Sequence, residues 1–238
     1  MGSIVAVPGV GAPPVRQAGR MTVALEGFHA VKHALRFAPD LVREISVTSL
    51  SDALALCDQL APDVSELLAA LARESRVEHP TGVTGIADRP FEDRTVLTSR
   101  RTPMVVLDHP RHPGNAGATI RVAAAAGASG VAVLGALDPW HPAVLRGSAG
   151  LHYALPVLSC ALEQIRGTVF ALDADGTPVG EIPDDAVLVV GSERSGVFAD
   201  VRERADAVVA LPMTPGVSSL NLATAVSAVL YAWRLRRD

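Results

Sequence analysis

The stretch MVVLDHPRHPGNAGATIRVAAAAGASGVAVL, from Met104 to Leu134, alternates between two kinds of segment. Two short apolar runs, residues 104–107 and 131–134, have the length and the continuous hydrophobicity of buried strands. Between them, residues 115–126 are rich in Ala, the strongest helix former. Continuous apolar strands joined through a helix are typical of a parallel sheet covered on both faces. The stretch therefore predicts an α/β domain built on a parallel sheet.

The same alternation continues to the C-terminus. Further strands are expected at residues 154–158, 168–173, 187–191 and 207–211, and helices at 142–148, at 161–165 and after the serines near 218. In such sheets ligands bind beyond the carboxyl ends of the strands. The loops that follow Leu107, Val190 and Leu211 are therefore the places to look for chemistry.

The N-terminal third follows a different pattern, which predicts a small mixed α/β domain over residues 22–90. It holds an expected helix at 25–35, a strand at 43–49, helices at 53–60 and 64–71, and a turn with a short strand at 79–87. Residues 1–21 are expected to be a flexible tail and not a signal peptide, because no basic region precedes the short apolar run. Residues 91–103 are charged and are expected to link this domain to residues 104–238.

Composition excludes several classes of protein. The 238 residues contain two cysteines, Cys57 and Cys160, too few for a disulfide framework or a zinc site, and this fits a reducing cytoplasm. Charged residues interrupt every apolar run, so no membrane span is expected. The net charge of −4 argues mildly against a generic nucleic-acid binder. Of the 21 Lys and Arg residues only Lys32 is lysine, a bias that suits phosphate contacts but that a GC-rich genome also explains.

The loop DHPRHPGNAGATIR lacks both familiar phosphate-binding patterns, GxxxxGK[ST] and GxGxxG. Asn115 lies where the helix should begin, so it is either an N-cap or a site residue. Arg121 follows six residues later, among residues that look buried, which weakens its reading as a plain surface residue. His109 and His112 lie beside prolines with no clustered Cys or carboxylate, so an exposed turn is favoured over a metal site.

The loop VVGSERSGV places Gly191 directly after a strand, where the backbone can approach a ligand closely. Glu193 and Arg194 follow at its mouth. A serine hydrolase is not supported, because the GxSxG elbow is absent and no histidine follows His152. In the third loop, LPMTPGVSSLN, helix capping explains one serine but not Ser218, Ser219 and Asn221 together.

Taken together, these loops resemble the SpoU (TrmH-type) RNA 2′-O-methyltransferases of the SPOUT class. The matching motifs are NAGATIR (115–121), GSERSG (191–196) and LPM…SSLN with its basic helix, together with RGSAGLHYALPV (146–157). They occur in the family's order and spacing from Met104 to the C-terminus. The segment before them is similar, more loosely, to the ribosomal-protein-like RNA-binding domain that precedes many members.

The resemblance implies a parallel-sheet domain with a deep trefoil knot, S-adenosylmethionine held by the loops, no metal, and a homodimer with the active site near the subunit interface. The implied cofactor-binding residues are Gly191, Leu211, Met213, Ser218 and Leu220, and the implied catalytic residues are Asn115, Arg121, Glu193, Ser219 and Asn221. Arg121 is expected to be essential, either as a phosphate ligand or in proton removal. Asn115 and Glu193 are expected to hold Arg121 and the ribose.

The expected activity is therefore methylation of a ribose 2′-hydroxyl in structured RNA, with ribosomal RNA favoured over transfer RNA. One alternative is a catalytically idle member that binds RNA or S-adenosylmethionine. Another is a SPOUT enzyme that methylates a tRNA base. The presence of both the Asn115–Arg121 motif and the Ser-Leu-Asn motif favours ribose chemistry.

Overall fold

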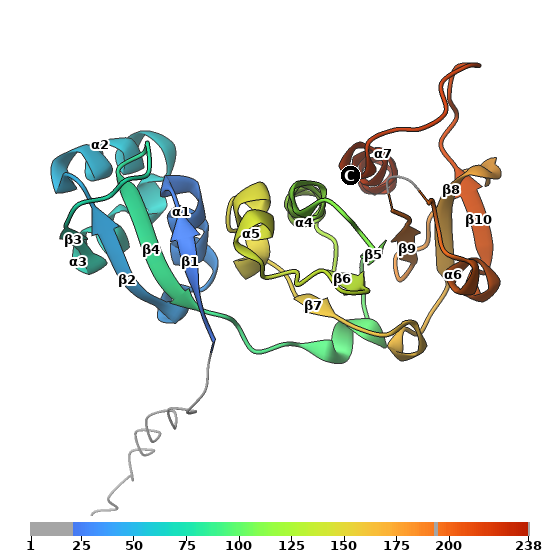
Figure 1. The fold of residues 1–238 in the computed structure, drawn as a ribbon, viewed down its shortest axis with the longest axis horizontal. Helices are drawn as coiled ribbons and strands as arrows, with labels where there is room; N and C mark the ends of the chain where they lie inside the picture. The colour runs from blue at the N-terminus through green and yellow to red at the C-terminus, as the bar shows by residue number, and fades with distance from the viewer. Residues whose placement is uncertain (1–20, 193–194, 238) are drawn as a thin grey trace, which may run out of the picture.

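The computed structural model describes residues 21–192 and 195–237, so almost all of the predicted tail lies outside the described residues. Two sheets, each with its own helices, lie side by side (Figure 1). The first is drawn in blue to green and the second in green to red.

The first sheet has four strands in the order β1-β4-β2-β3. Its strands are β1 (Thr22–Glu26), β2 (Val42–Val47), β3 (Ala72–Glu74) and β4 (Val83–Asp88), and its helices are α1 (Phe28–Phe37), α2 (Leu50–Leu60) and α3 (Ser65–Leu71), with short 3-10 turns at Pro39–Leu41 and Pro62–Val64. Strand β4 pairs antiparallel with β1 and β2, while β2 and β3 are parallel. Both edge strands, β1 and β3, are additions to the sequence prediction.

The second sheet has six strands in the order β10-β8-β9-β5-β6-β7, and every neighbouring pair is parallel. The strands are β5 (Met104–Asp108), β6 (Gly130–Leu134), β7 (Val157–Ser159), β8 (Val169–Pro178), β9 (Val187–Val190) and β10 (Ala207–Ala210). All residues of β5, β6 and β9 are buried, which explains why these strands are apolar except for Asp108 at the end of β5. The predicted parallel α/β sheet is confirmed. The strand expected at 154–158 begins only at Val157, because residues 151–153 form a 3-10 turn.

Helices cover both faces of this sheet. Helices α4 (Pro113–Ala126) and α7 (Leu222–Arg234) pack against each other, and their buried residues share one core with β5, β6 and β9. The opposite face is covered by α6 (Ala199–Arg204), which the sequence did not predict, and by 3-10 turns at Arg94–Leu97 and Leu162–Gln164. The latter turn stands where an α-helix was expected. Helix α5 (Pro142–Ser148) has the predicted bounds.

The expected linker is not a free segment in its second half. Val96 and Leu97 are buried in the core of the second sheet. Arg100 donates from Nε to the carbonyl of Asp185 at 2.7 Å and also bonds the carbonyls of Val96 and Leu97. The segment is therefore anchored to the second sheet before β5 begins.

The two units share a packed boundary. Trp140, Leu145 and Tyr153 belong to the hydrophobic core of the first sheet although they come from the second unit. His33 in α1 hydrogen-bonds through Nδ1 to the carbonyl of Ala149 at 2.7 Å. At Gly150, whose φ is 77°, an added Cβ would lie 2.8 Å from the backbone of Ala30, so only glycine permits this approach. The boundary sets α1 beside the 3-10 turn Leu151–Tyr153 and β1 beside α5.

Candidate active site

A cavity of about 340 Å³ opens at the carboxyl ends of β8, β9 and β10. Its walls are formed by the end of β8, the loop after β9, and the loop between β10 and α7. The lining residues are Leu172, Asp173, Ala174, Val190, Gly191, Ser192, Gly196, Val209, Ala210, Leu211, Met213, Ser218, Ser219, Leu220, Leu222 and Ala225. This is the edge of the sheet at which the sequence predicted ligand binding.

A break in the pairing of β8 with β10 makes one wall of this pocket. Val208 pairs with Ala171, but the next residue, Val209, pairs with Thr177. Leu172 still pairs with Val190 of β9, but residues 173–176 have no partner in β10, and Asp173 enters the lining there. Gly176 allows the bulge to close, because a Cβ there would lie 2.6 Å from the backbone of Val209.

The loop after β9 folds back on itself. Ser192 and Gly196 exchange backbone hydrogen bonds at 3.0 and 3.1 Å. A Cβ on Gly191 would lie 2.0 Å from the carbonyl carbon of Gly196, so Gly191 is required for this closure. From the sequence, Gly191 was expected to let a ligand approach the backbone closely. In the structure, the atoms that approach it most closely are the loop's own backbone. Gly191 nevertheless lines the pocket as predicted.

Asn221 joins the two helices that meet at the site. Its Oδ1 accepts from the backbone N–H groups of Ala223 and Thr224, which makes it the N-cap of α7. Its Nδ2 donates to Oδ1 of Asn115 at 3.0 Å, which ties the start of α7 to the start of α4. One asparagine therefore both caps α7 and ties it to α4.

Two capping alternatives that the sequence left open do not hold. Ser218 does not cap α7, because the helix starts at Leu222, four residues further on, and Asn221 occupies the cap position. Asn115 does not cap α4 either. That helix begins at Pro113 after His112, which leaves Asn115 inside the first turn, turned toward Asn221.

The third loop supplies the largest share of the predicted cofactor residues. Leu211, Met213, Ser218 and Leu220 all line the pocket, and so does Ser219, which was expected to be catalytic. Together with Gly191, all five residues expected to bind the cofactor therefore surround one cavity.

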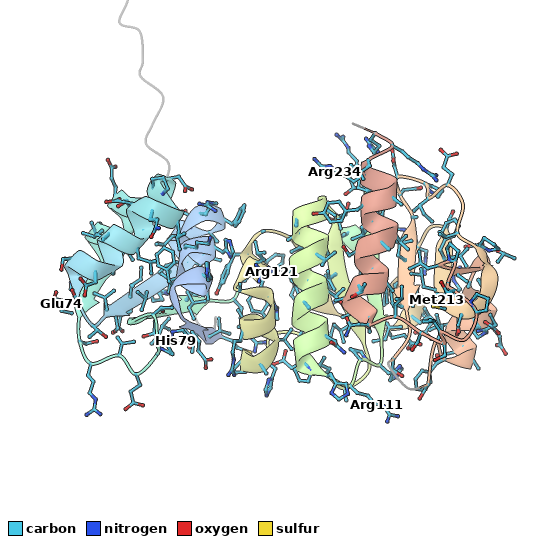
Figure 2. The ribbon with its side chains drawn as sticks, turned by 90° about the horizontal axis from the view of Figure 1, so that it is seen from above. Glu74, His79, Arg111, Arg121, Met213 and Arg234 are labelled. Atoms are coloured by element: carbon cyan, nitrogen blue, oxygen red, sulfur yellow. The ribbon has the colours of Figure 1, made fainter. Side chains whose placement is uncertain are left out.

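Arg121 stands apart from this cavity. It is exposed on α4, and Figure 2 shows it on the side of the molecule that faces the first sheet, whereas Met213 lies toward the far side. Its charge acts on α1: burial lowers the pKa of His29, and Lys32 and Arg121 lower it further. A single chain thus does not bring Arg121 to the pocket. Glu193 and Arg194 lie outside the described residues.

Asp173 is a pocket residue that the sequence analysis missed. Its Oδ2 accepts from Nη1 of Arg202 at 2.9 Å and lies 3.4 Å from the backbone N of Val197. The signal was available, because Asp173 stands at the carboxyl end of an expected strand, where ligands of parallel sheets bind. The end of this strand carries none of the three motifs, so the motifs did not point to it.

Comparison with known proteins identifies the family to which this fold belongs. Residues 102–231, more than half of the chain, match the SpoU rRNA Methylase family. The chain belongs to that family. It is thus an S-adenosylmethionine-dependent RNA methyltransferase of the ribose 2′-hydroxyl, as the sequence predicted.

Two relatives extend the similarity beyond the matched segment. One is the "23S rRNA (uridine(2479)-2'-O)-methyltransferase" of Streptomyces viridochromogenes, 32% identical over 82% of this chain and 70% of its own length. The other is the "23S rRNA (guanosine(2553)-2'-O)-methyltransferase RlmP" of Bacillus subtilis, 30% identical over 90% of this chain and 88% of its own length. Both alignments include much of the N-terminal unit.

Solved structures of SpoU methylases have the same fold. The AviRb SpoU methyltransferase of Streptomyces viridochromogenes, in complex with AdoMet, has a TM-score of 0.75 and 24% identity and covers 91% of this chain and 90% of its own. An AdoMet-bound rRNA methyltransferase from Sinorhizobium meliloti has a TM-score of 0.70 and 25% identity and covers 90% and 87%.

The pocket of this SpoU methylase fits the cofactor of its family. Its volume lies at the lower end of the range for small-molecule sites. Leucine and valine side chains offer apolar walls, while Ser218, Ser219 and Asp173 offer hydrogen-bonding groups to a polar ligand. Within the described residues no group of three or more His, Cys, Asp or Glu could hold a metal ion. None of the helices in residues 21–192 and 195–237 combines the length and hydrophobicity needed to cross a membrane.

Proposed function

We propose that this SpoU methylase methylates a ribose 2′-hydroxyl in the RNA of the large ribosomal subunit. The observation that carries the proposal is the hydrogen bond between Asn115 and Asn221 beside the 340 Å³ pocket. It joins two of the family's motifs at one point, next to the residues of the third loop. The substrates in the names of the two relatives, both 23S rRNA, support the choice of RNA.

We place S-adenosylmethionine in the pocket, held by Gly191, Leu211, Met213, Ser218 and Leu220. When bound, it supplies an electrophilic methyl group. The walls contributed by Leu172, Val190 and Leu222 exclude water around it.

The ribose hydroxyl must lose its proton as the methyl group is transferred, and it must be aligned with that group. We assign alignment to the side chains that border the pocket, Asn115, Asn221 and Ser219, and we include Glu193 from its place in the second motif. Arg121 is always protonated in ordinary surroundings, so we assign it to a phosphate of the target nucleotide rather than to proton removal.

We propose that two copies of the chain form the active unit. In one chain Arg121 faces away from the pocket, so a second copy is the simplest source of the missing guanidinium. Apolar side chains stay exposed around the pocket and α7: Val217 (51%), Leu220 (44%), Tyr231 (39%) and Leu235 (73%). Exposed apolar surface of this kind suits an interface between copies.

We further propose that residues 22–90 bind RNA and that residues 104–238 form a knotted catalytic domain. Positive charge supports the first part, since Lys32 of α1 lies close enough to Arg36 and Arg121 for their charges to add to the effect of burial and lower its pKa. The second part is supported by the strand order, in which β9 lies between β5 and β8 while α7 returns to pack on α4. Free thiols at Cys57 and Cys160 support a cytoplasmic setting.

The test uses methyl-labelled S-adenosylmethionine with unmodified transcripts of 23S rRNA and, separately, of tRNA. We expect label in 23S rRNA, within a dinucleotide that resists alkaline cleavage because its 2′-oxygen is methylated. Label in tRNA alone would move the substrate to tRNA, and label in a base would overturn the ribose assignment. Binding of the cofactor in calorimetry without transfer to either RNA would favour the idle member.

A further inference from the structure

Two aromatic rings stack at the same edge of the second sheet as the pocket. His109 follows β5 and Phe198 precedes α6, and their ring centroids lie 4.5 Å apart at an interplanar angle of 29°. Neither residue lines the pocket, and the proposed function assigns neither of them a role. Both side chains nevertheless keep part of their surface exposed to solvent, and no role yet accounts for this stacked pair.

One buried carboxylate holds the ring of His109 and the backbone of Phe198. Asp108 is 0% exposed. Its Oδ1 lies 2.7 Å from Nδ1 of His109, and its Oδ2 accepts from the backbone N–H of Phe198 at 2.7 Å. A carboxylate can only accept, so Nδ1 of His109 carries a proton and donates it to the bond. Asp108 thereby fixes the loop before α4 relative to the loop before α6.

The backbone of His109 is held in an unfavourable conformation. Its φ is 48°, one of two positive values among the described non-glycine residues. The ring fits only because position 135 is glycine, where an added Cβ would lie 2.5 Å from Cδ2 of His109. Strain of this kind persists where the surroundings impose it, and it clusters at functional sites.

The pair keeps a large exposed surface close to the reaction site. The side chain of His109 is 44% exposed, and Phe198 is 39% exposed. Strand β5 neighbours β9, whose end lines the pocket, and Phe198 stands two residues beyond Gly196 of the lining. Asn115 lies six residues beyond His109. Flat, immobile rings bind a flat partner with little loss of conformational entropy.

We propose that His109 and Phe198 form a stacking platform for an unpaired nucleobase of the substrate RNA, next to the nucleotide whose ribose is methylated. Sequence-specific RNA binding commonly stacks splayed bases on aromatic side chains. The inference rests on the proposed function and deepens it, because it requires the target to lie in a loop or bulge and not inside a duplex.

The test measures binding of an unmodified 23S rRNA transcript to protein loaded with S-adenosylhomocysteine, so that no transfer occurs. The variants are Phe198→Leu, which removes one ring, and His109→Asn, which removes the other but tolerates positive φ. Each should raise the Kd at least about fivefold, since stacking on an aromatic side chain contributes ~1–3 kcal/mol per base. Phe198→Tyr keeps the ring and should stay within about twofold of the wild type.

Two further readouts separate stacking from other causes. The slope of log Kd against log salt should be unchanged in both variants, because no phosphate contact is lost. Affinity for S-adenosylhomocysteine in calorimetry should also be unchanged. An unaltered Kd in both variants overturns the platform. So does a rise in Kd accompanied by a shallower salt slope or by weaker binding of S-adenosylhomocysteine.

Label transfer by the wild-type protein, run alongside, decides the proposed function separately. A wild type that binds the transcript through both rings but transfers no methyl group would contradict the proposed function and leave the platform standing. A wild type that does not bind the transcript would overturn the platform, and transfer to tRNA would then redirect the substrate.

Discussion

Arg121 illustrates how far a residue can stand from the chemistry that its motif implies. It shares a short motif with Asn115, yet six residues of helix at 3.6 per turn set the two side chains roughly 120° apart around α4. A sequence motif fixes spacing along the chain and the helix fixes direction. Neither specifies which copy of the chain supplies a group to a given pocket.

The first prediction concerns this residue. Arg121→Ala should fold and bind S-adenosylmethionine with unchanged affinity, because it does not contact the pocket, but it should lose at least about a hundredfold in methyl transfer, as the loss of a charged positioning group does. Calorimetry and label transfer measure the two quantities. Arg121→Lys keeps the charge without the bidentate geometry and should recover only part of the rate. Activity near the wild-type level in Arg121→Ala would remove it from the site.

His152 gives a prediction about stability. It is 0% exposed, its Nε2 donates to the carbonyl of Pro139 at 2.8 Å, and Ser148 Oγ lies 2.7 Å from its Nδ1. Burial lowers its pKa from 6.5 to about 4, and the Pro139 carbonyl, Arg89 and Asp138 modify that shift. The folded state thus holds His152 neutral, while the unfolded chain binds a proton near pH 6.5.

These pKa values determine how stability changes with pH. Stability from the neutral His152 is complete above the unfolded pKa and is lost as the pH falls toward about 4. The loss by about pH 5 should be ~2 kcal/mol, measured as the free energy of unfolding in urea. His152→Gln cannot titrate, so its curve should fall less steeply over the same range. Parallel curves for the two proteins would exclude His152 as the cause.

At the scale of the element, strongly buried strands and capped helices could be predicted from the sequence. Short elements with few local signals could not. Strand β5 and helix α5 were predictable because the first four residues of β5 are all apolar and α5 has proline at its first position. Strand β3 has three residues and helix α6 has six with no side-chain cap, so their stability comes from neighbours that are distant in sequence.

The candidate site divides in the same way. The loops that line the pocket were predictable from motifs. The contribution of Asp173 depends on the register break between β8 and β10, a tertiary feature that no local pattern specifies. The hydrogen bond from Asn221 to Asn115 likewise depends on how α4 packs beside α7, which is also a tertiary feature.

Helix α7 provides a prediction that separates capping from positioning. Asn221→Ala removes the cap and should cost ~1 kcal/mol, or about 2–4 °C in Tm for a chain of this size. Asn221→Ser restores a cap, but its short side chain cannot reach Asn115, so the Tm should recover while methyl transfer stays low. Thermal unfolding and label transfer are compared for the same preparations. Recovery of both quantities in Asn221→Ser would reduce Asn221 to a capping residue.

At the scale of the whole molecule, the proposed exchange of Arg121 between copies can be tested by mixing. Arg121→Ala and Asn221→Ala should each be inactive alone, because every site then lacks one group. After unfolding and refolding together, half of the dimers should be mixed and carry one intact site, which gives about a quarter of the wild-type activity. No activity in the mixture, with mixed dimers verified by differently tagged chains, would place both residues in the site of one chain.

The packed boundary between the two units has a consequence for what the protein can act on. Gly150 against Ala30, His33 on the carbonyl of Ala149 and the shared core around Trp140 leave no hinge between the first sheet and the pocket. With RNA bound by residues 22–90, as proposed, the distance from that binding surface to the pocket is therefore fixed. A substrate RNA must then hold the feature bound by the first unit and the target ribose at one separation. Lengthening the RNA helix between these two points should abolish methylation even when every contacted nucleotide is retained.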